Sequence, residues 1–270
     1  MHKTLSYSSY QKSPFRSTKH SSYFEAYDDL FERYIDKNIT FVEIGVLSGG
    51  SLFMWRDFFG EKARIIGIDL NPSAKKWEAE GFEIFIGSQS DENFWKDFID
   101  SVGKVDIVLD DGGHSYEQQI ITTEMLLDNI KDGGVLVVED THTSYMDGFG
   151  AHKFSFLNYT KKFIDRINFR FGGFPNKVSD NRVWNIQIYE SIIAFKVNRA
   201  ASHVISEQTE NGGISDSVND FRYDDNLRIT LINKLRSSLK FLRVIPGSRY
   251  AFLLLFKLFT NRSKKVKKYF

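Results

Sequence analysis

The stretch TFVEIGVLSGGS at residues 40–51 decides the fold of this chain, because it joins a short apolar run to a glycine-rich turn and then to a helical pattern. We predict a strand at 40–45 and a helix at 49–59. The same alternation predicts strands at 63–70, 82–88, 105–111 and 133–140, and helices at 23–34, 75–80, 91–101, 116–130 and 155–167. Short apolar strands that alternate with helices are typical of a parallel sheet covered on both faces. The sequence therefore predicts an α/β fold with a doubly wound, mostly parallel sheet.

The last two predicted strands complete a seven-stranded sheet. Residues 183–190 and 191–197 are apolar runs separated by a very tight turn, which is typical of an antiparallel hairpin at one edge. The predicted domains are an irregular segment at 1–22, an α/β domain at 23–200, a polar linker at 201–226 and a basic tail at 227–270.

The composition of the 270 residues limits the possible functions. Hydrophobic residues make up 41% of the chain, which is enough for a sizeable core. The chain contains no cysteine, so disulfides, thiolate metal sites and cysteine nucleophiles are excluded. Residues 1–24 are polar and lack the apolar segment of a signal peptide. We therefore expect the cytoplasm as the location.

Acidic residues follow four of the predicted strands. They are Glu43, Asp69, Asp110, Asp111, Glu139 and Asp140. Ligands of such sheets bind beyond the carboxyl ends of the strands, so we expect these carboxylates to converge on one rim. Neighbouring carboxylates repel one another unless a cation or a polar ligand compensates their charge. The pattern predicts both a polar cofactor and a divalent metal.

The glycine-rich turn after the first strand predicts the cofactor site. Gly45 allows close backbone approach to a ligand, and Ser48 lies in the same turn. The glycine spacing matches neither the dinucleotide fingerprint nor the phosphate-binding loop. The acidic residue before Gly45 would repel a pyrophosphate but suits a cationic sulfonium. Asp69 is placed to accept from ribose hydroxyls, and Ser88 and Gln89 are placed to recognise an adenine edge. Together these features indicate S-adenosylmethionine rather than NAD.

The acidic pairs after the fourth and fifth strands predict the metal site. Adjacent strands lie about 4.8 Å apart, so Asp111, Glu139 and Asp140 can meet on one ion. Oxygen ligands favour Mg²⁺ or Mn²⁺ over zinc. His114, three residues after Asp111, is the expected base that takes a proton from a metal-bound hydroxyl. His142 is the alternative base, or a residue that orients a metal ligand.

Two motifs carry a resemblance to a known family. DDGGH at 110–114 and VEDTHTSY at 138–145 resemble the metal-dependent macrolide-sugar O-methyltransferases of the mycinamicin and tylosin type, and related proteins long labelled cephalosporin hydroxylases. TKHSSY at 18–23 and IYESII at 188–193 fit the same pattern, so the resemblance covers residues 18–197. It implies a class I methyltransferase fold and the metal ligands and base named above. It assigns S-adenosylmethionine to Glu43, Gly45, Asp69, Gln89 and Asp110.

The C-terminal segment has a charge pattern of its own. Residues 228–270 contain twelve basic residues and no acidic one, whereas the remainder carries 24 basic and 35 acidic residues. Leucines recur at helical spacing from Leu227 to Leu242, and an apolar run follows at 250–259. That run is shorter than the ~20 residues that span a bilayer. It suits an anionic membrane surface, with an oligomerisation helix or a solvated tail as alternatives. Nucleic acid is not an expected partner, because the acidic remainder would repel phosphates.

The sequence thus predicts an enzyme, an S-adenosylmethionine- and Mg²⁺-dependent O-methyltransferase of a sugar hydroxyl. The expected acceptor is a surface polysaccharide or a lipid-linked glycan, and the expected location is the cytoplasm or the inner face of the membrane. One alternative is a natural-product enzyme that methylates a macrolide deoxysugar. Another is a catalytically inactive, cofactor-binding protein at the membrane. We also expect a homo-oligomer.

Overall fold

The computed structural model describes residues 4–172, 174, 176–214 and 227–238, and the single residues 247, 250, 254, 257 and 269. The chain divides into two compact units, Met1–Glu207 and Gln208–Phe270. All seven strands of the sheet described below lie in the first unit.

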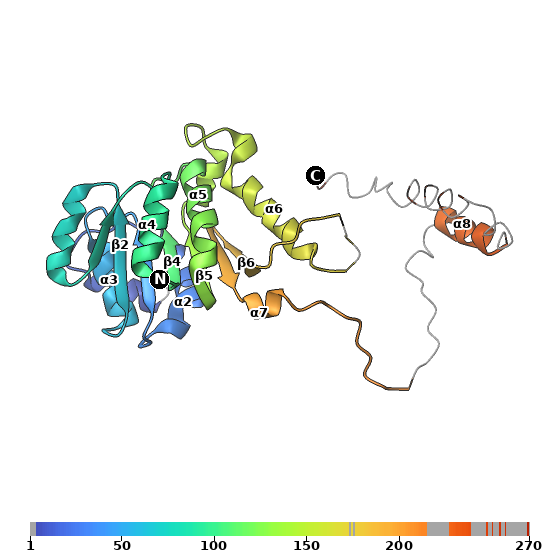
Figure 1. Ribbon diagram of the computed structural model, residues 1–270, viewed down its shortest axis with the longest axis horizontal. Helices are drawn as coiled ribbons and strands as arrows, with labels where there is room; N and C mark the ends of the chain where they lie inside the picture. The colour runs from blue at the N-terminus through green and yellow to red at the C-terminus, as the bar shows by residue number, and fades with distance from the viewer. Residues whose placement is uncertain are drawn as a thin grey trace. The chain divides into compact units, whose positions relative to one another are not determined.

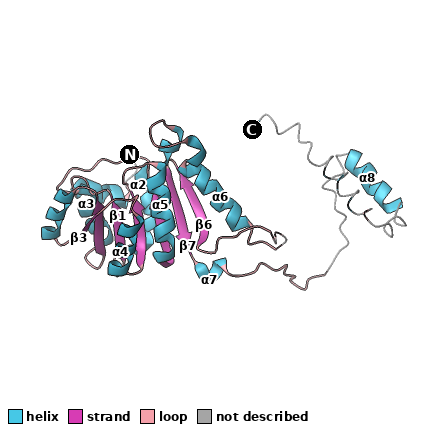
Figure 2. Ribbon diagram, turned by 45° about the horizontal axis from the view of Figure 1, so that its top comes forward, coloured by secondary structure: helices cyan, strands magenta, loops and turns pink. Residues whose placement is uncertain are grey.

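The first unit is built on one seven-stranded sheet with the strand order β3-β2-β1-β4-β5-β7-β6 (Figures 1 and 2). Its strands are β1 Thr40–Ile44, β2 Arg64–Asp69, β3 Glu83–Ile86, β4 Val105–Asp110, β5 Ile130–Val138, β6 Val183–Tyr189 and β7 Ile192–Val197. The first five strands are parallel, and β7 runs antiparallel to both β5 and β6. The predicted mostly parallel sheet and its terminal antiparallel hairpin are confirmed.

The helices alternate with these strands. Described α-helices are α1 Leu5–Lys12, α2 Tyr23–Phe31, α3 Gly50–Phe59, α4 Glu92–Val102, α5 Tyr116–Leu126, α6 Phe156–Asn168, α7 Arg199–Ser202 and α8 Leu227–Ser238. Short 3₁₀ helices are η1 Glu32–Tyr34, η2 Pro72–Glu80, η3 Leu127–Asn129, η4 Thr141–Tyr145 and η5 His152–Phe154. Side chains next to the first turn fix where several helices begin. Asp91 accepts from the amide of Asn93 at the start of α4, and Ser115 forms a capping box with Gln118 at the start of α5.

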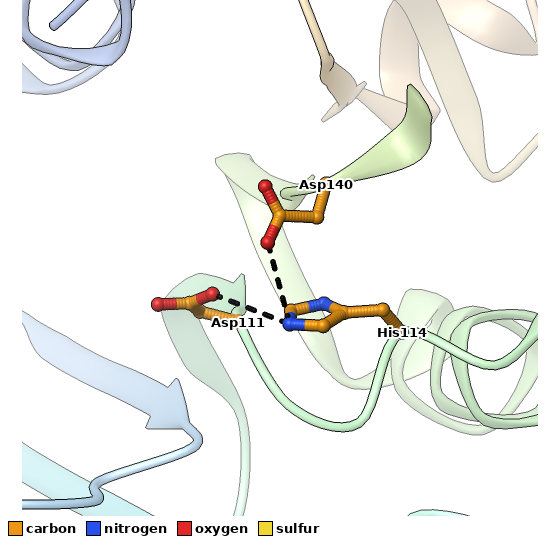
Figure 3. A group of neighbouring side chains, drawn as sticks. All are labelled: Asp111, His114 and Asp140. Atoms are coloured by element: carbon orange, nitrogen blue, oxygen red, sulfur yellow. Dashed lines mark ion pairs between the residues drawn. The ribbon is translucent and has the colours of Figure 1, made fainter. Parts of the chain in front are cut away.

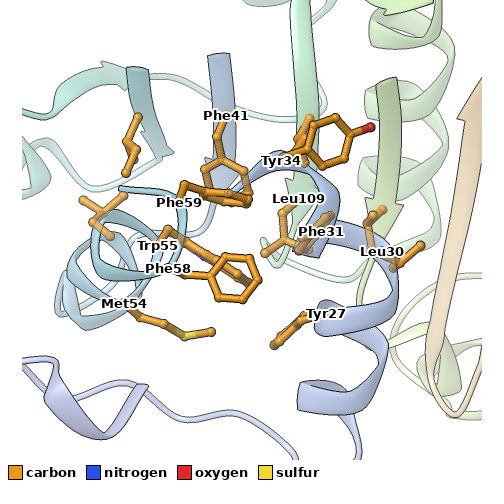
Figure 4. Close-up of a cluster of buried hydrophobic side chains, with 14 of the residues drawn as sticks. Tyr27, Leu30, Phe31, Tyr34, Phe41, Met54, Trp55, Phe58, Phe59 and Leu109 are labelled. Atoms are coloured by element: carbon orange, nitrogen blue, oxygen red, sulfur yellow. The ribbon is translucent and has the colours of Figure 1, made fainter. Parts of the chain in front are cut away.

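Each face of the sheet has its own hydrophobic core, because the side chains of a strand alternate between faces. On one face α2 and α3 contribute an aromatic cluster that includes Phe31, Trp55 and Phe59, and it packs on Phe41 of β1 (Figure 4). On the other face α4, α5 and α6 cover residues such as Val42 of the same strand. Figure 1 shows α4 and α5 side by side on this second face.

The expectation of an irregular segment at residues 1–22 is wrong for Leu5–Lys12, which form α1. The side chain of Thr4 caps the helix by accepting from the amide of Tyr7. The amides of Leu5 and Ser6 donate to the carboxylate of Asp28 in α2, at 2.6 and 2.9 Å. The first amides of α1 are satisfied by Asp28 of another helix, so the helix could not be predicted from the spacing of its own residues.

The second unit is described mainly at α8. Leu227, Leu231 and Leu235 of this helix are exposed, so the predicted helical spacing of leucines is present. Among the described residues, no helix is both long and apolar enough to cross a membrane. Most of the predicted apolar run at 250–259, the basic end and linker residues 215–226 lie outside the described residues.

Candidate active site

Asp110 and Asp111 leave the end of β4 toward opposite faces of the sheet, as the alternation of side chains requires. The Oδ1 atom of Asp110 accepts from Gln89 Nε2 at 2.6 Å, and the same amide lies 3.2 Å from the hydroxyl of Thr122 in α5. Asp111 instead lies 2.6 Å from the ammonium of Lys19, on the face covered by α2. The acidic residues at the strand ends therefore do not all converge, since Asp110 points away from the others.

Asp111 and Glu139 become neighbours through the register of the sheet. β4 and β5 pair in parallel with Asp110 opposite Val138, so the next residues of the two chains stand side by side. The ammonium of Lys19 lies between them, 2.6 Å from Asp111 Oδ2 and 3.1 Å from each oxygen of Glu139. The hydroxyl of Tyr27 in α2 donates to Glu139 Oε1 at 2.6 Å. The ammonium of Lys19 thus bridges two of the predicted metal ligands, Asp111 and Glu139.

The backbone of Asp140 is left-handed, with φ 53° and ψ 33°, and this conformation follows the end of β5. Asp tolerates the left-handed region better than most residues do. Its Oδ1 accepts from the hydroxyl of Tyr23, and its Oδ2 lies 3.3 Å from Nε2 of His114. The left-handed turn therefore brings Asp140 to the α2 side of the sheet edge.

His114 lies between Asp111 and Asp140 (Figure 3). Its Nε2 is 3.9 Å from Asp111 Oδ1 and 3.3 Å from Asp140 Oδ2. One ligand atom from each of these three side chains lies within 4.8 Å of the other two. The two carboxylates are spaced to hold a divalent cation that keeps some of its water, and the imidazole lies beside that position. The predicted ligand Glu139 adjoins this group but has both oxygens on Lys19.

Lys19 is a site residue that the sequence reasoning missed. Its side chain is only 2% exposed and is held by Asp111 and Glu139. Burial lowers the pKa of Lys19, but the two carboxylates outweigh this effect and hold that pKa well above its usual value. Burial also raises the pKa of Glu139, with Asp111 adding to the rise and Lys19 opposing it. A signal was available, because buried carboxylates need a compensating cation and Lys19 stands in the TKHSSY motif.

The predicted cofactor residue Glu43 is fully buried beneath the glycine-rich turn. Its carboxylate accepts from Ser51 Oγ at 2.7 Å and from Trp55 Nε1 at 3.0 Å, so it fastens α3 to β1. Burial raises the pKa of Glu43 to about 7, although Lys19 and these hydrogen bonds act against the rise. Glu43 therefore holds the position of the turn from below.

We expect Glu43→Gln to remove part of the pH dependence of stability. The carboxyl has a pKa of about 7 in the folded protein and about 4.3 when unfolded. The folded protein therefore binds more protons between these values, and its free energy of unfolding falls as the pH rises through this range. Because Gln cannot ionise, the variant should gain about 1–3 kcal/mol relative to wild type between pH 5 and pH 8.

Urea denaturation at both pH values, in the presence of a chelator, measures this gain. Glu83→Gln is the control, because Arg64 holds the pKa of Glu83 below its usual range and the side chain is exposed. It should show no such gain at pH 8. A difference between Glu43→Gln and wild type that stays constant across the pH range would contradict the prediction.

Gly45 forms the closest approach between two loops of the site. Its φ is +94°, and a Cβ placed there would lie 2.1 Å from the carbonyl oxygen of Asp111. The amide of Gly45 donates to the carbonyl of Ile68 at the end of β2. The turn after β1 is therefore pressed against the loop after β4, and no side chain fits between them.

Asp69 organises the turn on its other side. Its Oδ2 accepts from the backbone amides of Val46 and Leu47, both at 2.9 Å, and its Oδ1 accepts from the amide of Asn71 at 2.8 Å. A carboxylate has about four acceptor positions, so capacity remains for a further donor. Asp69 lines the main cavity of the site.

Gln89 links this cavity to the acidic loop after β4. Its Oε1 accepts from the amide of Gly113 at 2.9 Å, while its Nε2 holds Asp110. Burial raises the pKa of Asp110 to about 7, although its hydrogen bonds with Gly112 and Gln89 oppose the rise. The second oxygen of Asp110, Oδ2, is buried and has no hydrogen-bond partner within the described protein. Asp110 does not line the cavities described below.

Three adjoining cavities follow the carboxyl edge of the sheet. The largest, about 340 Å³, is lined by Gly45, Asp69, Ser88, Gln89, Asp111, His114 and Asp140 among others. A cavity of about 150 Å³ is lined by Thr18, Lys19, His20, Tyr23, Asp111, Glu139 and Asp140. A third, about 250 Å³, includes Ser48. The first is within the size range of small-molecule sites, and it brings four predicted cofactor residues to the base and metal candidates.

His142 lies behind the metal candidates. Its Nδ1 contacts the hydroxyl of Ser191 in the turn between β6 and β7, and it is 3.9 Å from Asp140 Oδ1. The ring of His20 lies 6.0 Å from that of His142. His142 makes no hydrogen bond to Asp140 at this distance, so the alternative that it orients a metal ligand stays a prediction.

Comparisons with known proteins find similarity to methyltransferases. Residues 42–141 match the model of a family described as a methyltransferase domain. The chain is 30% identical over 196 residues to the 8-demethyl-8-alpha-L-rhamnosyl tetracenomycin-C 2'-O-methyltransferase of Streptomyces olivaceus, over 67% of this chain and 51% of that one. It is 33% identical over 132 residues to the mycinamicin VI 2''-O-methyltransferase of Micromonospora griseorubida, over 46% of this chain and 33% of that one.

A solved structure shows the same fold. The MycE methyltransferase from the mycinamycin biosynthetic pathway, in complex with Mg and SAH, has a TM-score of 0.64 and 27% identity, over 74% of this chain and 55% of that one. The chain spans only 51% and 33% of the lengths of the two curated relatives described above. The resemblance drawn from the motifs is confirmed. Residues 42–141 therefore match a methyltransferase domain, and the chain shares the class I fold of the MycE structure and is similar to the sugar O-methyltransferases named for tetracenomycin and mycinamicin.

Proposed function

We propose that this protein is an S-adenosylmethionine- and Mg²⁺-dependent O-methyltransferase that acts on the hydroxyl of a sugar. One observation carries the proposal. The cavity of about 340 Å³ is lined by the predicted cofactor residues and also by His114, Asp111 and Asp140. A methyl donor, a cation and a proton acceptor would thus share one enclosed space. The names of the relatives, and the Mg and SAH of the MycE structure, support the same chemistry.

The residues around the glycine turn would bind the cofactor. Asp69 has acceptor capacity for ribose hydroxyls beyond its three backbone donors. Gly45, Ser88 and Gln89 line the same cavity, and Gly45 lets the turn after β1 lie against the loop after β4. Glu43 would act through the turn that it supports, because its carboxylate is already bound to Ser51 and Trp55.

The carboxylates at the ends of β4 and β5 would hold the divalent cation. Asp111 and Asp140 offer oxygens at suitable spacing, and Glu139 lies beside them. When bound, Mg²⁺ or Mn²⁺ would supply a Lewis acid that lowers the pKa of a bound hydroxyl. His114 would take the proton of that hydroxyl at Nε2, the atom that points between the two carboxylates (Figure 3). His142, in contact with Ser191, would stand beside Asp140 without a hydrogen bond to it.

The acceptor that we propose is the sugar of a glycosylated small molecule. This alternative is better supported than the polysaccharide prediction, because the relatives are named for rhamnosyl tetracenomycin and mycinamicin. The cavity of about 150 Å³, lined by His20 and Tyr23, would receive the sugar beside the metal candidates. Its aromatic and polar walls suit a sugar ring, which presents both C–H and hydroxyl groups.

Two experiments test the proposal. The first is isothermal titration with S-adenosylmethionine, with and without Mg²⁺, and the second is a methyl-transfer screen. The acceptors are rhamnosylated and deoxysugar-bearing small molecules, together with lipid-linked glycans. We expect cofactor binding and transfer to a small-molecule sugar that a chelator abolishes. Transfer that persists in chelator would contradict the metal role, and absence of cofactor binding would contradict the whole proposal.

A lipid-linked acceptor is the second candidate, and the charge pattern favours it. Residues 228–270 carry twelve basic residues and no acidic one, and the leucines of α8 are exposed. Near an anionic surface each Lys or Arg contributes about 1 kcal/mol. Under this reading the full chain should sediment with vesicles containing 30% phosphatidylserine at low salt, and release from them in 0.5 M NaCl. Failure to sediment at low salt would exclude a location at the inner membrane face. Light scattering of the unbound protein would test the expected homo-oligomer.

A further inference from the structure

Lys19 lies on the segment 13–22, which connects α1 to α2 and passes over the carboxyl edge of the sheet. Its ammonium makes three close contacts, with Asp111 Oδ2 at 2.6 Å and with both oxygens of Glu139 at 3.1 Å. The side chain is only 2% exposed. The ammonium therefore binds one oxygen of Asp111 and both oxygens of Glu139 at the centre of the site.

A divalent cation would draw on the same oxygens. Asp111 belongs to the group whose ligand atoms lie within 4.8 Å of one another, and Glu139 adjoins that group. An ion at this position would also stand a few ångströms from the charge of Lys19. At an effective dielectric constant of about 20, two like charges at about 5 Å repel strongly enough to change a binding constant about 100-fold.

We propose that Lys19 is a built-in competitor of the divalent cation: its ammonium and the ion bind the same carboxylates, and each weakens the binding of the other. The inference rests on the metal site of the proposed function. Such coupling is reciprocal, so the ion must also weaken the hold of Asp111 and Glu139 on Lys19. The site then tunes its affinity for metal through a residue outside the sheet.

The segment is anchored on both sides of Lys19, so the side chain alone can move. The ring of Phe15 packs 4.6 Å from that of Trp77, and Ser13 Oγ donates to the carbonyl of Gly50 at 2.7 Å. On the other side the hydroxyl of Tyr23 donates to Asp140 Oδ1 at the end of β5. A lysine has four rotatable bonds, which allow its ammonium to leave the carboxylates while the backbone stays in place.

Titration of the full chain with Mn²⁺, followed by calorimetry, tests the inference. We expect Lys19→Met to bind Mn²⁺ about 10- to 100-fold more tightly than wild type, because the competing charge is gone and the packing volume is kept. Lys12→Met is the matched control. Lys12 lies in α1 and pairs with Asp57 in an exposed ion pair, so its removal should leave the Mn²⁺ affinity unchanged.

The outcomes separate this inference from the proposed function. Equal or weaker Mn²⁺ binding by Lys19→Met, with normal binding by wild type, would overturn the competition while leaving the metal site in place. Absence of Mn²⁺ binding by both proteins would overturn the proposed metal site and the competition together.

Lysine-selective acetylation of wild type, read by mass spectrometry, decides the matter if Lys19→Met does not fold. Lys19 is buried and paired, so its acetylation is expected to be slow with chelator and several-fold faster with saturating Mg²⁺. Lys12 provides the internal reference, because its exposed side chain should react at the same rate in both conditions. Acetylation of Lys19 that Mg²⁺ leaves unchanged or slows would overturn the competition.

Discussion

Replacing His114 by Asn is expected to lower the rate of methyl transfer about 100- to 10,000-fold, because the acceptor hydroxyl loses the group that takes its proton. Asn is chosen since His114 has a left-handed backbone with φ +58°, a conformation that Asn also adopts. The affinity for S-adenosylmethionine should change little, because the predicted cofactor residues are untouched. Single-turnover kinetics with saturating acceptor, together with calorimetric titration of the cofactor, measure the two effects separately.

His142→Asn is the matched control for this experiment. His142 contacts Ser191 and approaches Asp140 only to 3.9 Å, so its loss should lower the rate far less than loss of His114. The reverse order, with His142→Asn the slower enzyme, would assign the base to His142. Normal turnover by His114→Asn would remove the proton-transfer role from this side chain.

Gly45→Ala is expected to abolish cofactor binding and to lower the free energy of unfolding by about 2–4 kcal/mol. The new methyl group would lie 2.1 Å from the carbonyl oxygen of Asp111, so the loops after β1 and β4 must separate. A left-handed backbone, with φ +94°, adds strain for any side chain. Urea denaturation and titration with S-adenosylmethionine measure both losses.

Gly133→Ala separates the two causes. Gly133 has a similar φ of +88°, but a Cβ placed there meets no atom within 4 Å. This variant should lose about 1–2 kcal/mol from backbone strain and should bind the cofactor normally. If Gly45→Ala proved no worse than Gly133→Ala in both measurements, the contact between the two loops would have no role in the site.

The sheet could be predicted from the sequence because each strand is a short apolar run, and the central strands are buried on both faces. Phe41 and Val42 illustrate this, since they belong to different cores on opposite faces of β1. The hairpin could also be predicted from the sequence, because only a tight turn separates its two strands. The ends of the elements were predicted less accurately. The predicted helix at 75–80 is part of the longer 3₁₀ helix η2, Pro72–Glu80.

Contacts between segments far apart in the sequence could not be predicted from local patterns of apolar residues. Asp110 and Asp111 are identical in sequence terms, yet the pleat of β4 sends one to Gln89 and the other to Lys19. The expectation of a single acidic rim ignored this alternation. Asp140 is a different case, because its left-handed backbone brings it back to His114 and no residue type required that turn.

The smaller cavity is walled on one side by a single short stretch of chain, from Thr18 to Tyr23, and on the other by the strand ends. If it receives the acceptor as proposed, substrate range and methyl-donor chemistry are encoded in separate parts of the gene. Randomising His20, which lines the smaller cavity but not the larger one, would then sample new acceptors in a directed-evolution library while the residues of the cofactor pocket stay unchanged. The same arrangement gives natural variation a route to new glycoside substrates through a few codons.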